Sequence, residues 1–384
     1  MDLAVVVPKP DSEARIAALE AEGVYDDARK VREHDAERVE LPVTARPSDT
    51  PIERVVEQSD PELRAPGLDD LLRERGWSEA ERDRAPSSWA VVGTVILADF
   101  TDCPRPTEVG DALLDLHSEA DTVLARGGID GEHREPDVSV VAGAGDTETV
   151  HTEHGTKYAL DLSRVMFAPG NKAERARMGE VVRDGEQSEP SECASSEGRS
   201  SSDHSSGRSP REDGNGGPAS GDGERVLDMF AGIGYFALPM ARAGATVTAV
   251  EKNPESFRYL AENAQLNDVS ENLDCVLGDC REVDSEADRV VMGYYDALGG
   301  GPVDEVETSE GGPGYLDAAL DNLVSGGVLH VHSAVPEAEL WERPESRLRA
   351  GCERAGRSVD IEARRRVKSH SAGVEHVVLD ARIA

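Results

Sequence analysis

The stretch from Val226 to Glu251, VLDMFAGIGYFALPMARAGATVTAVE, decides the fold of this chain. It begins with a short apolar run that ends in Asp228, and a turn containing Gly232 and Gly234 follows. A helical pattern and a second apolar run come next. This order predicts the strand, glycine-rich turn, helix and strand of a Rossmann-like α/β domain. The glycines let the backbone approach a ligand closely, and we expect Glu251 to accept hydrogen bonds from both hydroxyls of a ribose.

Two classes of cofactor fit this pattern. The spacing Gly232-x-Gly234-x-x-Ala237 by itself also fits a nicotinamide site. However, the segment that begins at Asp228 resembles the turn of enzymes that use S-adenosylmethionine (SAM), where an acid lies near the methionine end of the ligand. Asp279 ends a later strand, where such enzymes contact the adenine amino group. The sequence therefore favours SAM, and it disfavours a domain without ligand because glycine-rich turns cost backbone entropy.

The composition indicates a protein from a cytoplasm of extreme salt. The 384 residues include 77 acidic and 41 basic residues, which gives a formal net charge of −36. Such a surface stays hydrated in strong salt, where the Debye length falls to about 3 Å and self-repulsion is screened. An acidic protein of ordinary salt is the alternative, and the scarcity of lysine favours the halophile.

The cysteines and the apolar runs bear on compartment and metals. The five cysteines form no C-x-x-C pair, which argues for a reducing compartment and against a zinc ribbon or an iron–sulfur cluster. No apolar run reaches the length of about 18 residues that a membrane helix needs, and no signal-peptide pattern begins the chain. We therefore expect a soluble, cytoplasmic protein without a bound metal.

The order of patterns along the chain predicts four parts. Residues 1–85 read as a small βαβ-like unit with a connector, and residues 86–182 as an α+β domain in which 90–98 form one strand. Residues 183–224 are rich in Ser, Gly, Pro and Glu with almost no apolar residue, which predicts a disordered insert without a function. Residues 225–384 form the Rossmann-like domain.

Three local patterns add detail to these parts. A helix is expected from Pro169, with Asn171 as a possible N-cap. Asn253 followed by Pro254 predicts the start of another helix. Residues 364–383 read as two strands joined by a turn, which predicts an antiparallel hairpin at the end of the sheet.

Four segments of the chain resemble one enzyme superfamily, in the same order and over nearly the full length. These are the archaeal and eukaryal tRNA guanosine-37 N1-methyltransferases and their relatives, the wybutosine-pathway aminocarboxypropyltransferases. The segments are Gly127–Arg134, Thr147–Gly155, Leu160–Arg175 and Asp228–Phe236. The resemblance implies a class I SAM-dependent methyltransferase fold and a tRNA partner bound at the anticodon loop. It also implies that the first part contacts tRNA and the second orients it.

Departures from the methyltransferase pattern indicate the subfamily. The methyltransferases carry an Asn-Pro-Pro or Asn-Leu-Pro turn after the fourth sheet strand, whereas this chain reads Val291–Tyr295 without Asn or Pro. They also carry Tyr and Arg where this chain has Met166 and Gly170. The resemblance thus favours transfer of an aminocarboxypropyl group from SAM to C7 of 4-demethylwyosine, leaving methylthioadenosine. The alternatives are guanosine-37 N1-methylation and a non-catalytic tRNA-binding protein with a relic SAM pocket.

The resemblance also implies site residues. Glu174 matches the general base of the methyltransferases and would take the C7 proton or hold the methionine part of SAM; the alternative is a first-turn glutamate favoured by the helix dipole. Arg134 and Arg175 match residues that steady the target base or its phosphate, against the alternative of solvated surface residues. The expected cofactor contacts are Asp228, Met229, Phe230, Gly232, Gly234, Glu251, Lys252, Asp279, Cys280 and Gly293.

Two further patterns have weaker implications. The basic run that contains Arg364, Arg365, Arg366 and Lys368 is a candidate phosphate contact, with a solvated face as the alternative. His330 and His332 lie two apart on an expected strand without a third ligand nearby in the sequence. We therefore expect these histidines to pack at a strand end and not to bind a metal.

Overall fold

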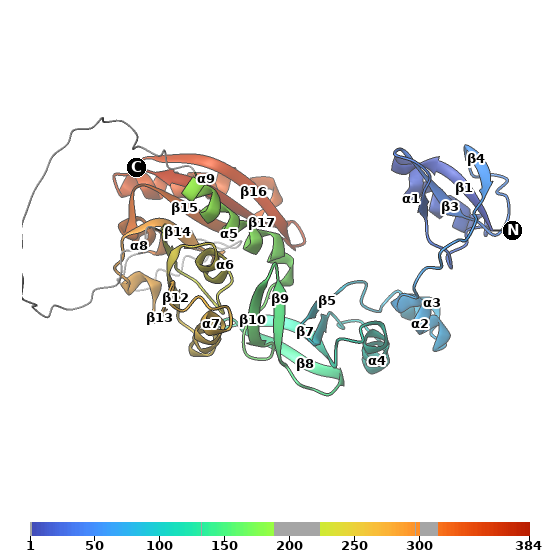
Figure 1. The fold of residues 1–384 in the computed structure, drawn as a ribbon, viewed down its shortest axis with the longest axis horizontal. Helices are drawn as coiled ribbons and strands as arrows, with labels where there is room; N and C mark the ends of the chain where they lie inside the picture. Colours follow the sequence, from blue (N-terminus) through green and yellow to red (C-terminus); the bar gives the residue numbers. More distant parts are fainter. Residues whose placement is uncertain (1, 132, 188–222, 296, 300–313) are drawn as a thin grey trace, which may run out of the picture. The chain divides into compact units, whose positions relative to one another are not determined.

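A computed structural model of the chain describes residues 2–131, 133–187, 223–295, 297–299 and 314–384 (Figure 1). The chain divides into two compact units, Met1–Ala85 and Pro86–Ala384. None of the helices in the described ranges combines the length and the apolar character that a membrane crossing requires. Each unit is described separately below.

The first unit is built on an antiparallel sheet in the order β2-β3-β1-β4. The predicted strands on either side of α1 are β1 and β3, which pair antiparallel, so the expected βαβ-like arrangement is wrong. Leu19 of α1 packs against Val5, Val7 and Leu41 of the sheet in a small apolar core. The elements are β1 (Leu3–Pro8), α1 (Ser12–Ala21), β2 (Arg32–Glu33), β3 (Arg38–Pro42), β4 (Arg54–Glu57), α2 (Leu68–Glu74) and α3 (Glu79–Arg82).

The second unit contains the predicted Rossmann-like sheet. Its seven strands have the order β13-β12-β11-β14-β15-β17-β16. Strands β11 to β15 are parallel, and the antiparallel pair β16 and β17 confirms the predicted terminal hairpin. The strands are β11 (Arg225–Asp228), β12 (Thr246–Glu251), β13 (Leu273–Leu277), β14 (Ala287–Met292), β15 (Leu323–Pro336), β16 (Val359–Ser371) and β17 (Val374–Ile383).

Helices cover both faces of this sheet. Successive strand side chains point to opposite faces, so Val226 belongs to the core beside α5, α6 and α7, whereas Leu227 belongs to the core beside α8 and α9. Asn253 confirms the predicted helix start, because its side chain accepts a hydrogen bond of 2.9 Å from the backbone N–H of Glu255. The helices are α5 (Lys172–Gln187), α6 (Ala237–Arg242), α7 (Pro254–Leu266), α8 (Tyr315–Asn322) and α9 (Glu342–Arg354).

Two smaller sheets precede the Rossmann-like part, a four-stranded sheet in the order β5-β6-β7-β8 and the antiparallel pair β9 and β10. The predicted single strand over 90–98 is wrong, because the backbone reverses at Gly93, whose φ is +58°, a value that glycine adopts readily. The neighbouring Thr94 N–H is held by Thr149 Oγ1 at 2.9 Å. The elements are β5 (Trp89–Val92), β6 (Val95–Ala98), α4 (Pro106–Leu116), β7 (Thr122–Asp130), β8 (Glu135–Gly143), β9 (Glu148–Glu153) and β10 (Thr156–Asp161).

The start of α5 and the insert both differ from expectation. A 3₁₀ turn, Pro169–Asn171, leads directly into α5, and the Lys172 N–H bonds to Pro169 O, so Asn171 does not act as an N-cap. Helix α5 continues through residue 187, which removes 183–187 from the predicted insert. Glu224, the last residue of that predicted insert, forms an ion pair of 2.8 Å with Arg289. Residues 188–222 of the insert lie outside the described residues.

Candidate functional site

A cavity of about 1220 Å³ opens in the second unit, at the carboxyl ends of the central parallel strands. Ligands of open α/β sheets bind at this edge, where the strand order reverses, here between β11 and β14. The volume exceeds the range of about 300–1,000 Å³ usual for one small ligand, so there is room for a cofactor and part of a second substrate. The expected site residues on its wall are Arg134, Arg175, Met229, Phe230, Gly232, Glu251, Lys252, Asp279, Cys280 and Gly293.

Glu251 is fixed at the end of β12 by two backbone donors. Its Oε2 accepts a hydrogen bond of 2.7 Å from the Gly232 N–H, and its Oε1 accepts one of 2.7 Å from the Asn253 N–H. Burial raises the pKa of this carboxyl. A carboxylate has about four acceptor positions, so further hydrogen bonds can be accepted from the cavity side. The predicted contact with a ribose diol would use these remaining positions, and it stays a prediction.

Asp279, at the end of β13, carries a cationic partner in the structure. Arg281 donates to its two carboxylate oxygens at 2.9 and 2.6 Å, and Lys252 Nζ lies 3.7 Å from Oδ2. The hydrogen bond from Arg281 holds the pKa of Asp279 at about 2. The Arg281 guanidinium also lies 4.9 Å from the ring centre of Tyr315. Asp279 therefore faces the cavity as a charged acceptor of fixed orientation.

Three aromatic rings form one wall of the cavity, which the glycine-rich motif does not indicate. The ring centres of Phe230 and Tyr294 are 5.5 Å apart, and those of Phe230 and Tyr315 are 5.1 Å apart. The Arg134 guanidinium lies 5.7 Å from the Tyr294 ring centre. Three separate segments contribute these rings, so a pattern within any one segment could not reveal the cluster. Flat apolar rings beside a guanidinium suit an aromatic ligand.

Arg175, on the cavity wall, forms a buried ion pair with Glu153. Its guanidinium donates to both oxygens of Glu153 at 2.7 and 2.8 Å and to Ala168 O at 2.9 Å. The two side chains are only 2% and 3% exposed, so the alternative of a solvated Arg175 is wrong. Burial alone raises the pKa of Glu153, but hydrogen bonds from His151 and Arg175 outweigh it and hold the pKa at about 2.

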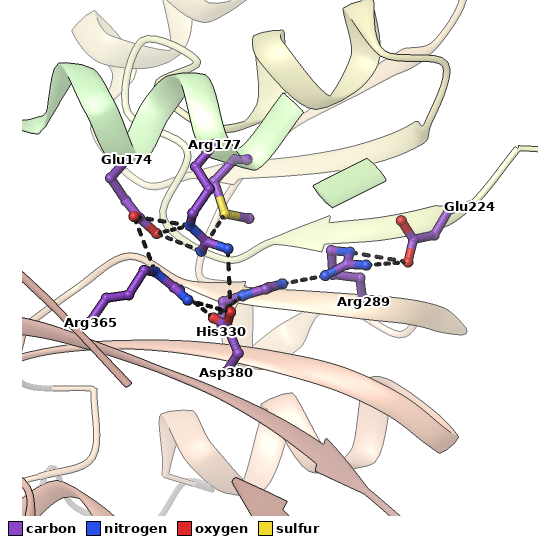
Figure 2. Close-up of polar contacts among 8 residues, drawn as sticks. Glu174, Arg177, Glu224, Arg289, His330, Arg365 and Asp380 are labelled. Carbon is purple, nitrogen blue, oxygen red and sulfur yellow. Dashed lines mark hydrogen bonds and ion pairs between the residues drawn. The ribbon is translucent and has the colours of Figure 1, made fainter. Parts of the chain in front are cut away.

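Glu174 does not lie on the cavity wall. Its carboxylate is bound by Arg177 at 2.6 Å and lies 3.6 Å from Arg365 Nε, as Figure 2 shows. Those two arginines also reach Asp380, at 3.3 and 2.7 Å. Asp380 accepts a hydrogen bond of 2.6 Å from His330 Nδ1. The structure therefore places Glu174 inside a charge network between α5 and the C-terminal hairpin, unlike a base open to the cavity.

Two expected cofactor contacts also lie behind the wall. Asp228 is fully buried, and its Oδ1 accepts a hydrogen bond of 3.3 Å from the Phe230 N–H. Asp228 therefore stabilises the backbone of the turn. Burial raises the pKa of Asp228 to about 7. Gly234 has a φ of +102°, and an added Cβ would meet Leu238 at 2.6 Å. Glycine is therefore required at position 234 for the backbone conformation and for packing against α6. The space left by its missing side chain is occupied by Leu238 and not by a ligand.

The histidines on β15 are buried, as predicted, but one of them also lines the cavity. His330 bonds to Asp380 and accepts a hydrogen bond from Arg289. His332 lies on the cavity wall, and its Nδ1 is 3.0 Å from Nε2 of His376. Burial lowers the pKa of His332 to about 3 and that of His376 to about 2. In the described part of the chain, no group of three or more His, Cys, Asp or Glu side chains is placed to hold a metal ion.

Replacing His376 with phenylalanine is expected to make the stability less sensitive to mild acid. His376 faces His332, Lys368, Glu174 and His370, and its folded-state pKa of about 2 lies well below the unfolded value of about 6.5. As pH falls from about 7.5 to 5.5, only the unfolded state binds this proton, which lowers the free energy of unfolding by about 1.4 kcal/mol. Urea unfolding at both pH values should show that the variant lacks this loss. An equal pH dependence in the two proteins would contradict it.

The basic run on β16 is largely paired with carboxylates. Arg364 binds Glu345 at 2.9 Å, Arg365 binds Asp380 at 2.7 Å and Arg366 binds Glu375 at 2.7 Å. Lys368 lies beside Gly170, where an added Cβ would be 3.1 Å from its Cδ. The arginines thus hold the terminal hairpin together, and a phosphate contact by this run stays a prediction.

Comparison with known proteins identifies the family. The chain matches the TRM5/TYW2 methyltransferase domain over residues 149–188 and 217–361, and the TYW2 N-terminal domain over residues 68–147. It is 32% identical over 304 residues to the tRNA(Phe) (4-demethylwyosine(37)-C(7)) aminocarboxypropyltransferase of Pyrococcus horikoshii, covering 78% of this chain and 90% of that protein.

Solved structures agree with this match. The structure of P. horikoshii TYW2 in complex with MeSAdo superposes with a TM-score of 0.59 at 29% identity, covering 81% of this chain and 96% of that one. The structure of Trm5b from Pyrococcus abyssi superposes with a TM-score of 0.65 at 26% identity and covers all of both chains. With the class I SAM-dependent methyltransferase-like fold and the cavity at the end of its sheet, these matches show that the chain belongs to the TRM5/TYW2 family.

Proposed function

We propose that this chain transfers the 3-amino-3-carboxypropyl group of SAM to C7 of 4-demethylwyosine at position 37 of tRNA(Phe), with release of methylthioadenosine. The cavity wall that follows β14 carries the proposal. Gly293, Tyr294 and Tyr295 line the cavity there, without an asparagine amide or a proline. An added Cβ at Gly293 would lie 3.3 Å from Phe236, so this backbone passes close to a ring. A flat aromatic wall suits a tricyclic base.

The residues on the wall fit SAM. Glu251 has acceptor positions left for a ribose diol, and Asp279 is a charged acceptor for an adenine amino group. Gly232 lines the cavity with a φ of +58°, and the place of its missing Cβ is taken by the ring of Tyr235, 2.7 Å away. SAM, when bound, supplies electrophilic carbons beside a sulfonium, and the protein's part is mainly orientation. The relative from P. horikoshii was solved with MeSAdo, which is the by-product that the proposal requires.

An acidic chain needs a particular way to bind tRNA. Strong salt removes most of the gain from counterion release, so binding must rest on shape, stacking and specific arginine contacts. Arg134, which lies against Tyr294 on the cavity wall, is placed for such a contact with the target nucleotide. We assign the anticodon-loop nucleotide to this cavity, and we assign a role in holding the tRNA to the first unit and the sheet of β5 to β8.

A tRNA guanosine-37 N1-methyltransferase is the second candidate. The P. abyssi Trm5b structure covers all of this chain, whereas the P. horikoshii TYW2 structure covers 81% of it. The sequence identity favours the first candidate, at 32% for the aminocarboxypropyltransferase against 26% for Trm5b.

One experiment separates these candidates. The protein is incubated with SAM and tRNA that carries either guanosine or 4-demethylwyosine at position 37, and the nucleosides and the spent cofactor are weighed by mass spectrometry. We expect an aminocarboxypropyl group on the tricyclic base together with methylthioadenosine. A methyl group on guanosine with S-adenosylhomocysteine would promote the methyltransferase. If SAM is titrated into the protein in high salt and calorimetry detects no binding, the result would favour a non-catalytic tRNA-binding protein.

Replacing Glu251 with alanine is expected to weaken SAM binding more than tenfold, which corresponds to about 1.4 kcal/mol or more. The change removes the acceptor for the ribose and frees the N–H groups of Gly232 and Asn253. Isothermal titration measures the dissociation constant. Glu262→Ala on the exposed side of α7, 51% exposed, is the matched control and should bind as the wild type does. Unchanged affinity in Glu251→Ala would remove Glu251 from the site.

We also propose that the protein is adapted to high salt, because its net charge of −36 is repulsive at low ionic strength. Raising KCl from about 0.1 M to about 2 M shortens the Debye length to a few ångströms. The melting temperature should therefore rise by at least about 5 °C, a shift that corresponds to roughly 2 kcal/mol or more in a chain of this size. A fall in melting temperature over this range, measured by differential scanning calorimetry, would show that the surface ion pairs outweigh the repulsion.

A further inference from the structure

Two residues of the cavity wall carry buried polar atoms for which the described residues offer no hydrogen-bond partner. They are Nε2 of His332 and Oδ1 of Asn171. Buried polar groups in proteins are almost always paired, with protein, water or ligand. His332 is only 1% exposed, so its nitrogen cannot be satisfied by bulk solvent. Such an atom on the wall of a ligand cavity points to a contact that a ligand completes.

The imidazole of His332 is held in a fixed orientation. Its Nδ1 is bonded to Nε2 of His376 at 3.0 Å, and its ring centre lies 4.9 Å from that of Phe236. The two nitrogens of an imidazole lie on different edges of the ring, so Nε2 is directed away from His376. A ring that is fixed before the ligand arrives loses little conformational entropy on binding.

The two histidines carry no charge, so each ring keeps one proton, and one of these two protons lies in the hydrogen bond between the rings. Each ring is neutral because burial holds the pKa values of both histidines far below neutrality. The charged groups that face His332 are Arg177, Arg365 and Asp380, and the neighbouring ring of His330 faces it as well. If His332 donates Nδ1–H to His376, its Nε2 carries a lone pair, and the proton of the His376 ring is on Nδ1. If His376 donates Nε2–H instead, then Nε2 of His332 carries the proton. The pair can therefore offer an acceptor or a donor without a change of charge.

The position of His332 in the sheet separates it from the cofactor's adenosine. The residues suited to ribose and adenine end β12 and β13, whereas His332 is on β15, three strands from β12 in the order β12-β11-β14-β15. Adjacent strands are about 4.8 Å apart, so about 14 Å separate the two places. A group other than the adenosine must therefore reach His332, and the cavity has the volume for a second ligand.

We propose that Nε2 of His332 hydrogen-bonds to the edge of the nucleobase that receives the transferred group, with the His332–His376 pair adjusting donor and acceptor to that edge. This inference rests on the proposed function, in which the second ligand is a base of tRNA. The methionine part of SAM is the competing partner, and affinity for SAM distinguishes the two.

Nitrogen NMR of the full-length wild type tests the contact directly. The histidine rings are labelled with ¹⁵N, and the His332 signals are assigned by their absence in His332→Phe. We expect the Nε2 signal to shift when substrate tRNA is added to the SAM-bound protein, and to stay in place when SAM alone is added. The inference is overturned if the Nε2 signal of His332 does not shift when tRNA is added, or if it already shifts when SAM alone is added. The variant serves only for the assignment, and the shift itself is measured on the wild type.

Single-turnover kinetics provide the second test. His332→Phe removes both nitrogens but keeps a ring against Phe236, and it should slow transfer at least tenfold while the dissociation constant for SAM stays within twofold. His332→Gln should recover part of the rate, because an amide can also donate or accept. The control is His154→Asn at an exposed turn where φ is +47°, a conformation that asparagine tolerates.

The two proposals fail in distinguishable ways. A wild-type rate in His332→Phe, or a more than threefold weaker affinity for SAM, overturns the role of His332. The mass of the product made by the wild type tests the proposed function independently. If the wild type transfers a methyl group, the single-turnover rate of methyl transfer is measured for the wild type and for His332→Phe. The ratio of these two rates still decides the inference.

Discussion

Replacing Arg175 with leucine is expected to lower the free energy of unfolding by about 3–5 kcal/mol, the usual result of removing one partner from a buried ion pair. The change leaves the Glu153 carboxylate, 3% exposed, beside His151 at 3.1 Å and without a cationic partner among the described residues. It also removes the guanidinium that lies 4.8 Å from the ring centre of Phe167. Domains are commonly stable by only about 5–15 kcal/mol, so this is a large fraction of the total.

The unfolding free energy lost in Arg175→Leu should become smaller as pH falls. The pKa of Glu153 is about 2 in the folded protein, against an unfolded value of 4.5. Its contribution to stability is therefore fully present above about pH 5 and is lost as pH falls toward 2. Arg175→Leu should flatten this part of the pH profile, as measured by chemical unfolding.

A double variant provides the control for this prediction. Arg175→Leu combined with Glu153→Leu removes both charges, so no unpaired charge remains in the interior, and at least half of the lost stability should return. A single Arg175→Leu variant as stable as the wild type would contradict the argument. So would a double variant that is less stable than the single one.

Replacing Asp380 with asparagine is expected to cost about 3 kcal/mol of unfolding free energy. Asp380 is the carboxylate that Arg177, Arg365 and His330 share, at 3.3, 2.7 and 2.6 Å (Figure 2). Without its charge, the guanidinium groups of Arg177 and Arg365, 18% and 26% exposed, share Glu174 as the remaining carboxylate among the described residues. The expected cost is at the lower end of the range for buried pairs because solvent partly screens both arginines.

The pH profile of Asp380→Asn identifies the cause. Burial alone raises the pKa of Asp380, but the hydrogen bond from His330 and the charges of the two arginines outweigh it and hold this pKa well below its usual range. The contribution of Asp380 to the free energy of unfolding is present above about pH 4 and is lost in acid. The difference in unfolding free energy between the wild type and Asp380→Asn should therefore shrink as pH falls. Asp360→Asn, exposed on β16 of the same hairpin, is the control and should change stability by less than about 0.5 kcal/mol.

The Rossmann-like half was predictable from the sequence because its signals are local. Gly232 and Gly234 have the positive φ values that favour glycine, and Asn253 caps α7 through a residue two positions away. Glu251 ends its strand within reach of the Gly232 N–H for the same reason: a parallel strand and the turn after its neighbour meet at one edge of the sheet. The family also follows from short segments that keep their order.

The sequence by itself therefore determined the fold class, the ligand edge of the sheet and the family. Only the tertiary structure decided which charged side chains face the cavity. Glu174 is paired with Arg177 of its own helix and lies 3.6 Å from Arg365 of the terminal hairpin, and Arg177 reaches Asp380 across 203 positions of the chain. The physical reason is that a carboxylate's role depends on the cation that meets it, and long-range strand pairing brings that cation. The same reason applies to His332, whose free nitrogen becomes visible only once His376 has paired with the other.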